Sequence, residues 1–186
     1  AAQYPANTLA DGTAAQVFDY MIERFRAWYE EESIPAEVFK SVSARNLSRP
    51  LDIQRRVAAV HAFSLLPQAQ ALAAANKRVA NILGKLDDAH IFGDVSANLL
   101  VKAEEKRLLA CLEELSNTCS KHLKREEYTE ALSCLADLRE PIDAFFEGVM
   151  VNVENIPLRD NRLNLLKRLR NLFLEVADIS LLAVSK

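Results

Sequence analysis

Apolar residues recur every three to four positions through most of the chain, which is the spacing of amphipathic helices. Over residues 14–31 one helical face carries Val17, Met21, Ile22, Phe25 and Trp28. At this spacing we expect Trp28 to be a core residue. The sequence holds only four glycines, and its many Ala and Leu residues also favour helix over strand.

Prolines and polar turns divide this pattern into separate segments. The predicted helices are 14–31, a short one after Ser33 and Pro35, 51–66, 67–86, 101–123, 126–139, 141–150 and 158–182. The prediction is an all-α fold, a helical bundle of about eight helices. Residues 13–186 are expected to form one domain, and residues 1–12 a linker or the edge of the fragment.

The composition excludes several classes of protein. With 186 residues, of which 50% are hydrophobic, the chain can bury a sizeable core and is not a disordered tail. No apolar run approaches the ~18 residues of a membrane span, so no membrane partner is expected. The three cysteines form no Cys-x-x-Cys motif, and no apolar leader opens the sequence. We therefore expect reduced thiols in a cytoplasmic protein.

The net charge of −3 hides an uneven distribution. Residues 45–85 carry seven basic and one acidic residue, and residues 158–186 carry six basic and three acidic. Residues 86–157, in contrast, carry seven basic and fifteen acidic residues. Because phosphate binding depends on the local density of Lys and Arg, the two basic segments could bind nucleic acid. A single such segment is usually a solvated helix face, and the presence of two makes that explanation weaker.

No motif for catalysis or metal binding stands out. One predicted helix carries a stripe made of Leu108, Cys111, Leu115, Cys119 and His122. Structural zinc normally needs closely paired ligands, so this stripe is interpreted as core. Neither a nucleophile triad nor a Gly-rich phosphate loop is recognisable. The sequence thus predicts no catalytic residue, no metal site and no cofactor within this segment.

Two blocks of sequence carry a family resemblance. Residues 145–166, FFEGVMVNVENIPLRDNRLNLL, resemble the signature of DALR-type anticodon-binding domains, and residues 73–83, AAANKRVANIL, are similar to a second helix of that family. Such domains occur in arginyl-tRNA synthetases and in the β subunit of the bacterial two-subunit glycyl-tRNA synthetase. Residues 51–72 and 172–180 are more similar to the C-terminal domain of the glycyl β subunit. One departure is that Asn155 and Pro157 replace the acidic residue and the alanine of the motif; Asn155 is still expected to cap the helix.

The resemblance implies a domain that holds the anticodon region of tRNA(Gly). Glycylation, with ATP and Mg, would take place on the α subunit of the full heterotetramer, which is the other expected partner. The candidate tRNA-binding residues are Arg55, Arg56, Asn76, Lys77, Arg78, Arg159, Arg162 and Lys167. Two of these have structural alternatives. Arg162 could pair with a carboxylate or tie down the preceding loop, and Asn76 could bond to a neighbouring connector.

Two other functions stay open at this point. The first is the anticodon-binding domain of an arginyl-tRNA synthetase, which the Arg55-Arg56 block and the end of the chain argue against. The second is a non-enzymatic helical scaffold that binds another protein through the acidic segment 86–157.

Overall fold

The computed structural model describes residues 10–87 and 90–183, and within them the chain is helical with no strand. The helices are α1 (Thr13–Glu31), α2 (Ala36–Ser43), α3 (Pro50–Ser64), α4 (Ala69–Leu83), α5 (Ala103–Lys124), α6 (Tyr128–Leu135), α7 (Arg139–Gly148) and α8 (Ile156–Leu174). Three short 3-10 helices are η1 (Ala97–Leu99), η2 (Ala136–Leu138) and η3 (Ile179–Leu182). The predicted all-α bundle is confirmed. Most of the predicted linker, residues 1–9, lies outside the described residues.

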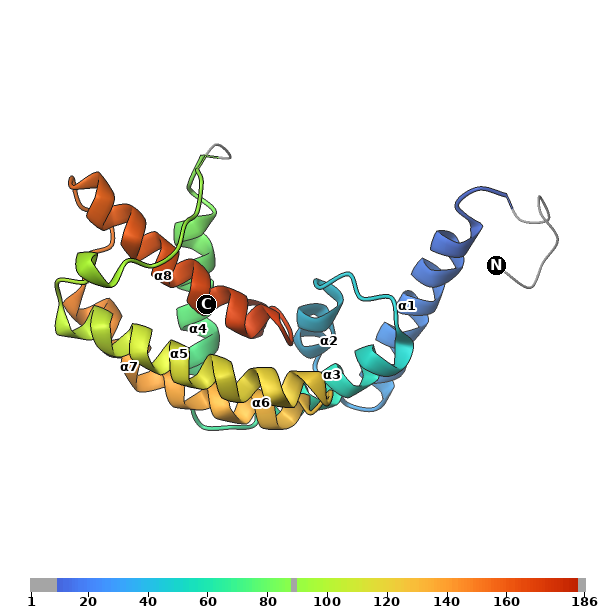
Figure 1. Ribbon diagram of the computed structural model, residues 1–186. Coiled ribbons are helices and arrows are strands. Elements are labelled where there is room, and N and C mark those ends of the chain that lie inside the picture. Colours follow the sequence, from blue (N-terminus) through green and yellow to red (C-terminus); the bar gives the residue numbers. More distant parts are fainter. Residues whose placement is uncertain (1–9, 88–89, 184–186) are drawn as a thin grey trace.

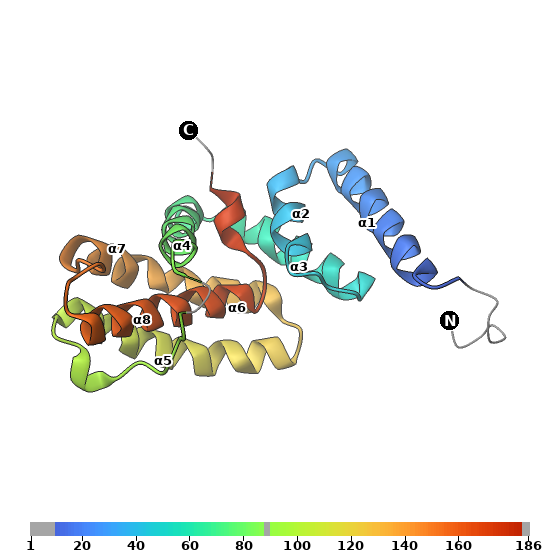
Figure 2. The same cartoon turned by 90° about the horizontal axis from the view of Figure 1, so that it is seen from above.

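Four helices form the body of the molecule. α5 contacts α7 and α8, and α4 contacts the same two helices, so the four are neighbours in a closed ring (Figure 2). α6 packs on α5 and α3, while α2 and η3 contact each other beside α4. α1 stands away from this body next to α2 (Figure 1).

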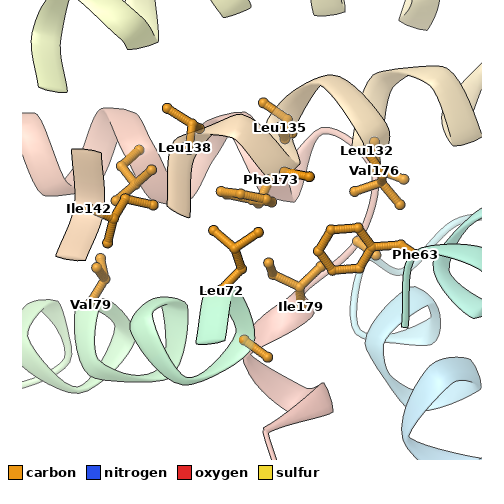
Figure 3. Close-up of a cluster of buried hydrophobic side chains, with 14 of the residues drawn as sticks. Phe63, Leu72, Val79, Leu132, Leu135, Leu138, Ile142, Phe173, Val176 and Ile179 are labelled. Carbon is orange, nitrogen blue, oxygen red and sulfur yellow. The ribbon is translucent and has the colours of Figure 1, made fainter. Parts of the chain in front are cut away.

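The hydrophobic core joins elements that are far apart in the sequence. Figure 3 shows side chains from α3, α4, α6, α7, α8 and η3 meeting in one cluster. Its labelled members are Phe63, Leu72, Val79, Leu132, Leu135, Leu138, Ile142, Phe173, Val176 and Ile179. Burial of each large apolar side chain stabilises the fold by about 1.5–3 kcal/mol. This cluster therefore fixes α3 and η3 against the ring of helices.

The prediction that Trp28 lies in the core is wrong. Trp28 is 43% exposed, whereas the neighbouring Tyr29 is 5% exposed and packs its ring 5.5 Å from that of Phe39. Consecutive helical residues point about 100° apart, so only one of the two aromatic rings can face α2. Burial raises the pKa of the Tyr29 phenol above its ordinary value.

Three predicted helix boundaries differ from the structure. The sequence suggests Ser33 as the N-cap of the short helix, but Ser33 has a left-handed backbone (φ 62°) and Pro35 occupies the N-cap position of α2. Pro67 lies in the turn before α4 rather than in its first helical turn. The last helix ends at Leu174 and not near residue 182. There the backbone N–H of Asp178 donates to the carbonyl of Ser41 at 2.9 Å, and this contact with α2 fixes a non-helical path before η3.

Candidate nucleic-acid interface

The start of α8 is organised by Asn155. Its Oδ1 accepts a hydrogen bond from the backbone N–H of Leu158 at 3.0 Å, which satisfies one of the unpaired donors of the first turn. Pro157 fits the same turn because its missing N–H would have had no helical partner. The predicted cap is therefore confirmed, despite the departure from the family motif.

Arg162 holds α8 to α5 inside the protein. Its Nε donates to Oε1 of Glu105 at 2.5 Å, and its Nη1 donates to the carbonyl of Met150 at 2.8 Å. Glu105 in turn accepts the backbone N–H of Lys102 at 2.6 Å, at the beginning of α5. Both structural alternatives for Arg162 are thus present at once, a carboxylate partner and a tie to the preceding loop.

Two asparagines of α8 hold the segment that connects α4 with α5. The amide of Asn161 exchanges two hydrogen bonds with the backbone of Ser96, at 2.7 and 3.0 Å. One turn later, Oδ1 of Asn164 accepts the N–H of Gly93 at 3.1 Å. This pair was not among the residues predicted from the sequence. The signal available was two Asn residues three positions apart on one helix, a spacing that places them on the same face.

Lys167 continues that face of α8. Its ammonium nitrogen lies 5.1 Å from the centre of the Phe92 ring, a cation–π contact that keeps the charge at the surface. Lys167 is half-buried, and so is Phe92. The connecting segment is therefore fixed along α8 by Asn161, Asn164 and Lys167 together.

The basic block on α4 divides into interior and surface residues. Asn76 is 1% exposed and donates to the Leu72 carbonyl of the preceding turn at 3.1 Å. Lys77 is half-buried and Arg78 is exposed. The guanidinium of Arg78 lies 4.1 Å from the centre of the Phe146 ring, beside a groove between α4 and α7 that small Ala side chains of α4 line.

The two adjacent arginines of α3 have different environments. Arg55 is exposed and pairs with Glu126, which also pairs with Arg49 at 3.3 Å. Arg56 is largely buried instead, with its side chain 12% exposed. Its guanidinium donates to Asp52, to the hydroxyl of Tyr128 and to two backbone carbonyls between α8 and η3.

The Tyr128 hydroxyl also donates to Asp52, so α3 and α6 share one buried polar network. Burial is the main cause that raises the pKa of Tyr128, and the hydrogen bond to Asp52 adds to it. This network fixes the Arg56 side chain in its largely buried position.

The signature regions at the start of α8 and along α4 lie within one known domain type. The model of the DALR anticodon binding domain matches residues 72–181. This chain belongs to the DALR anticodon-binding domain family. The match covers α4 to η3, while α1, α2 and α3 precede it.

Curated relatives of the chain are glycine–tRNA ligase β subunits. The subunit of Marinobacter nauticus is 54% identical over 172 residues, covering 92% of this chain and 25% of the relative. That of Ectopseudomonas mendocina is 48% identical over 181 residues, covering 97% and 26%. The subunit of Histophilus somni is 50% identical over 167 residues, covering 90% and 24%. The chain thus spans about a quarter of the length of these relatives.

In this chain the predicted binding residues do not form one cluster. Arg56, Asn76 and Arg162 direct their polar groups into the fold, as described above. The residues that reach the surface are Arg55, Lys77, Arg78, Arg159 and Lys167. Arg159 pairs with the adjacent Asp160 at 3.5 Å. Arg78 lies by the α4–α7 groove, which is opposite the α5–α8 side in the ring of four helices.

Across residues 10–87 and 90–183, no group of three or more His, Cys, Asp or Glu side chains is arranged to hold a metal ion. Burial raises the pKa of the Cys119 thiol to about 11, so this thiol is protonated at neutral pH. Within the described residues, no single helix has the length and composition of a membrane span. Only α3 and α4 taken together have them, and this pair of helices is bent by 111°.

Proposed function

We propose that this chain is the tRNA-binding segment of a glycine–tRNA ligase β subunit and that it binds the anticodon region of tRNA(Gly). The observation that carries the proposal is the identity of 48–54% to such β subunits over at least nine-tenths of the chain, together with the family match. The full enzyme would join glycine to its tRNA with ATP and Mg in the cytoplasm, at an active site on the α subunit.

In this proposal the segment itself makes no covalent bond. It holds one end of the tRNA so that the distant acceptor end reaches the active site. Single-stranded RNA loops are recognised by side chains that stack on bases and bond to their edges, while Lys and Arg hold the phosphates. Arg55, Lys77, Arg78, Arg159 and Lys167 are the predicted residues that the fold leaves at the surface for this role.

Binding to tRNA transcripts tests the proposal. The chain is titrated with tRNA(Gly), with tRNA(Gly) carrying substituted anticodon bases, and with tRNA(Arg). We expect the tightest binding to tRNA(Gly) and a loss of affinity on anticodon substitution, at about 1–3 kcal/mol for each base read directly. Equal affinity for all three RNAs would contradict anticodon reading, and preference for tRNA(Arg) would favour the arginyl alternative.

A salt titration separates RNA binding from the alternative of a protein-binding scaffold. An RNA complex loses affinity steeply as salt rises, because each neutralised phosphate releases condensed counterions. A scaffold that recognises protein through acidic helices has no measurable affinity for tRNA at any salt concentration. Absence of tRNA binding even at low salt would therefore refute the proposed function.

A further inference from the structure

The α5–α8 side of the ring carries a groove that sequence analysis did not identify. One depression lies between these helices and is lined by Leu112, Ser116, Lys124, Arg168, Asn171 and Glu175, among others. A second depression, lined by the connecting segment 92–95 and by α8, shares Arg168 and Asn171 with the first. The two are therefore continuous. From Lys167 to Glu175 the groove follows eight residues of α8, or about 12 Å.

Basic residues from two segments line this groove, and a third segment adds more beside one of its ends. Arg49, the N-cap of α3, and Arg55 both pair with Glu126 in the turn that follows α5. Lys124 and Arg125 immediately precede Glu126 and are exposed. Lys124 also lines the groove together with Arg168, and Lys167 follows at its other end.

The charge of this surface stays positive after its ion pairs are counted. Two arginines share the single carboxylate of Glu126, and Lys124, Arg125, Lys167 and Arg168 bring the basic residues to six. The acidic residues that pair with them or line the groove are four: Glu113, Glu126, Glu175 and Asp94. Arg168 pairs with Glu113 at 3.4 Å, but their side chains are 41% and 57% exposed. An exposed pair of this kind contributes at most about 1 kcal/mol, so Arg168 can exchange Glu113 for a phosphate at little cost.

The groove is suited to a phosphate chain rather than to a base. Where it runs between α5 and α8, none of the described lining residues is aromatic, and Ser116, Ser120 and Asn171 place hydroxyl and amide groups there that can donate to phosphate oxygens. At the other end the one aromatic lining residue, Phe92, has its ring contacted by the Lys167 ammonium. Recognition of unpaired bases depends largely on stacking against aromatic side chains, and the described residues between α5 and α8 provide none.

We propose that the phosphate track, defined as Arg49, Arg55, Lys124, Arg125, Lys167 and Arg168, binds the sugar–phosphate backbone of the RNA. This inference rests on the proposed function. The track positions the tRNA on the domain without reading its sequence, since phosphate contacts carry register and orientation but no base identity. It joins the two basic segments of the sequence through a third, residues 124–125, that lies within the acidic segment.

The test compares two double variants of this chain. Lys124→Ala/Arg168→Ala removes two charges of the track. Arg107→Ala/Arg139→Ala is the matched control; these arginines are 53% and 52% exposed and pair with Glu140 and Asp143 outside the track. Affinity for tRNA(Gly) is measured over a range of salt concentrations. Circular dichroism and thermal unfolding establish that all four substitutions leave the helices folded.

We expect the track variant to lose at least tenfold in affinity and to lower the slope of log K against log salt by about 1.4–1.8, the value for two phosphates. The loss should be the same on anticodon-substituted tRNA, and the charge-preserving variant Lys124→Arg/Arg168→Lys should keep the wild-type slope. The control should bind as the wild type does.

Two results would overturn the inference, and they are distinguishable. If the wild-type chain binds tRNA(Gly) and the track variant binds equally well with the same salt slope, the track is refuted and the proposed function stands. If the wild-type chain binds no tRNA at low salt, both fail together. A loss of affinity confined to one anticodon sequence would show base reading at the track and would also contradict the inference.

Discussion

The guanidinium of Arg162 lies 2.5 Å from the carboxylate of Glu105, with the two side chains only 5% and 0% exposed. The pair joins the middle of α8 to the first turn of α5, and the same guanidinium binds the Met150 carbonyl before α8. The arginine in the family signature is thus a structural connection in this chain. With Nε and Nη1 bound inside the fold and the side chain 5% exposed, the guanidinium is directed away from an RNA ligand at the surface.

Replacing Arg162 by Ala should destabilise the protein strongly. The substitution leaves the Glu105 carboxylate buried without its partner, which typically costs about 3–5 kcal/mol of unfolding free energy. Urea unfolding measures this loss. Arg168→Ala is the control, because it removes an exposed ion pair from the same helix and should cost less than about 1 kcal/mol. Similar losses for both variants would contradict the structural role of Arg162.

Alanine substitutions of the adjacent residues Arg55 and Arg56 should affect different properties, tRNA binding in the first case and stability in the second. Arg56→Ala removes a guanidinium that binds Asp52, Tyr128 and two backbone carbonyls, so we expect a loss of about 3 kcal/mol or more in unfolding free energy. Arg55→Ala should keep the unfolding free energy within about 1 kcal/mol of the wild-type value and should weaken tRNA binding. Thermal unfolding and RNA titration of the two variants check both statements, and a stable Arg56→Ala would refute the first.

The cap of α8 offers a smaller and sharper test. Asn155→Ala removes the acceptor for the Leu158 N–H and should cost about 1 kcal/mol of stability. Asn155→Asp restores the acidic residue of the family motif and keeps the acceptor, so its stability should equal or exceed that of the wild type. In chemical unfolding we expect the unfolding free energy to decrease from the Asn155→Asp variant to the wild type and then to the Asn155→Ala variant. An Ala variant as stable as the wild type would show that the cap contributes nothing.

The Cys119 thiol should be chemically inert in the folded protein. Burial raises its pKa from 9.0 to about 11, so between about pH 9 and 11 the folded thiol stays protonated while the unfolded one ionises. Its contribution to stability is therefore present below pH 9 and is lost as the pH rises towards 11.

Alkylation with iodoacetamide at pH 8, followed by mass spectrometry, tests this difference. Cys119 should react only after denaturation, whereas the half-buried Cys111 and Cys134 provide internal controls for access. Rapid labelling of Cys119 in the native protein would contradict the burial described above.

The fold class could be predicted because it depends on features that are local in the sequence. Apolar periodicity located the helices, and the Asn155 cap could be predicted from three neighbouring residues. The choice between Trp28 and Tyr29 depends on which side of α1 meets α2, and no local pattern contains that information. The end of α8 was predicted too late for the same reason, since a contact between Asp178 and Ser41 sets it.

The candidate site was less predictable than the fold. Charge counts along the chain averaged Lys124 and Arg125 into an acidic segment, although folding brings them to Arg49 and Arg55 around Glu126. The same counts could not distinguish Arg56 from Arg55. Both are arginines and count equally, although one is at the surface and the other donates hydrogen bonds to backbone carbonyls inside the fold. Burial and partners, which only the tertiary structure supplies, make the distinction.

The hydrogen bonds from Arg56 to the carbonyls of Glu175 and Val176 have a consequence for where this domain begins. The family match starts at Leu72, inside α4, but the β subunits compared above align with at least nine-tenths of the chain, α3 included. Contacts from α2 and α3 hold the polypeptide that leaves α8. A chain cut at Leu72 would remove the donor of these carbonyls and expose the apolar surface that Phe63 covers. We therefore expect the smallest cooperative folding unit to include α2 and α3.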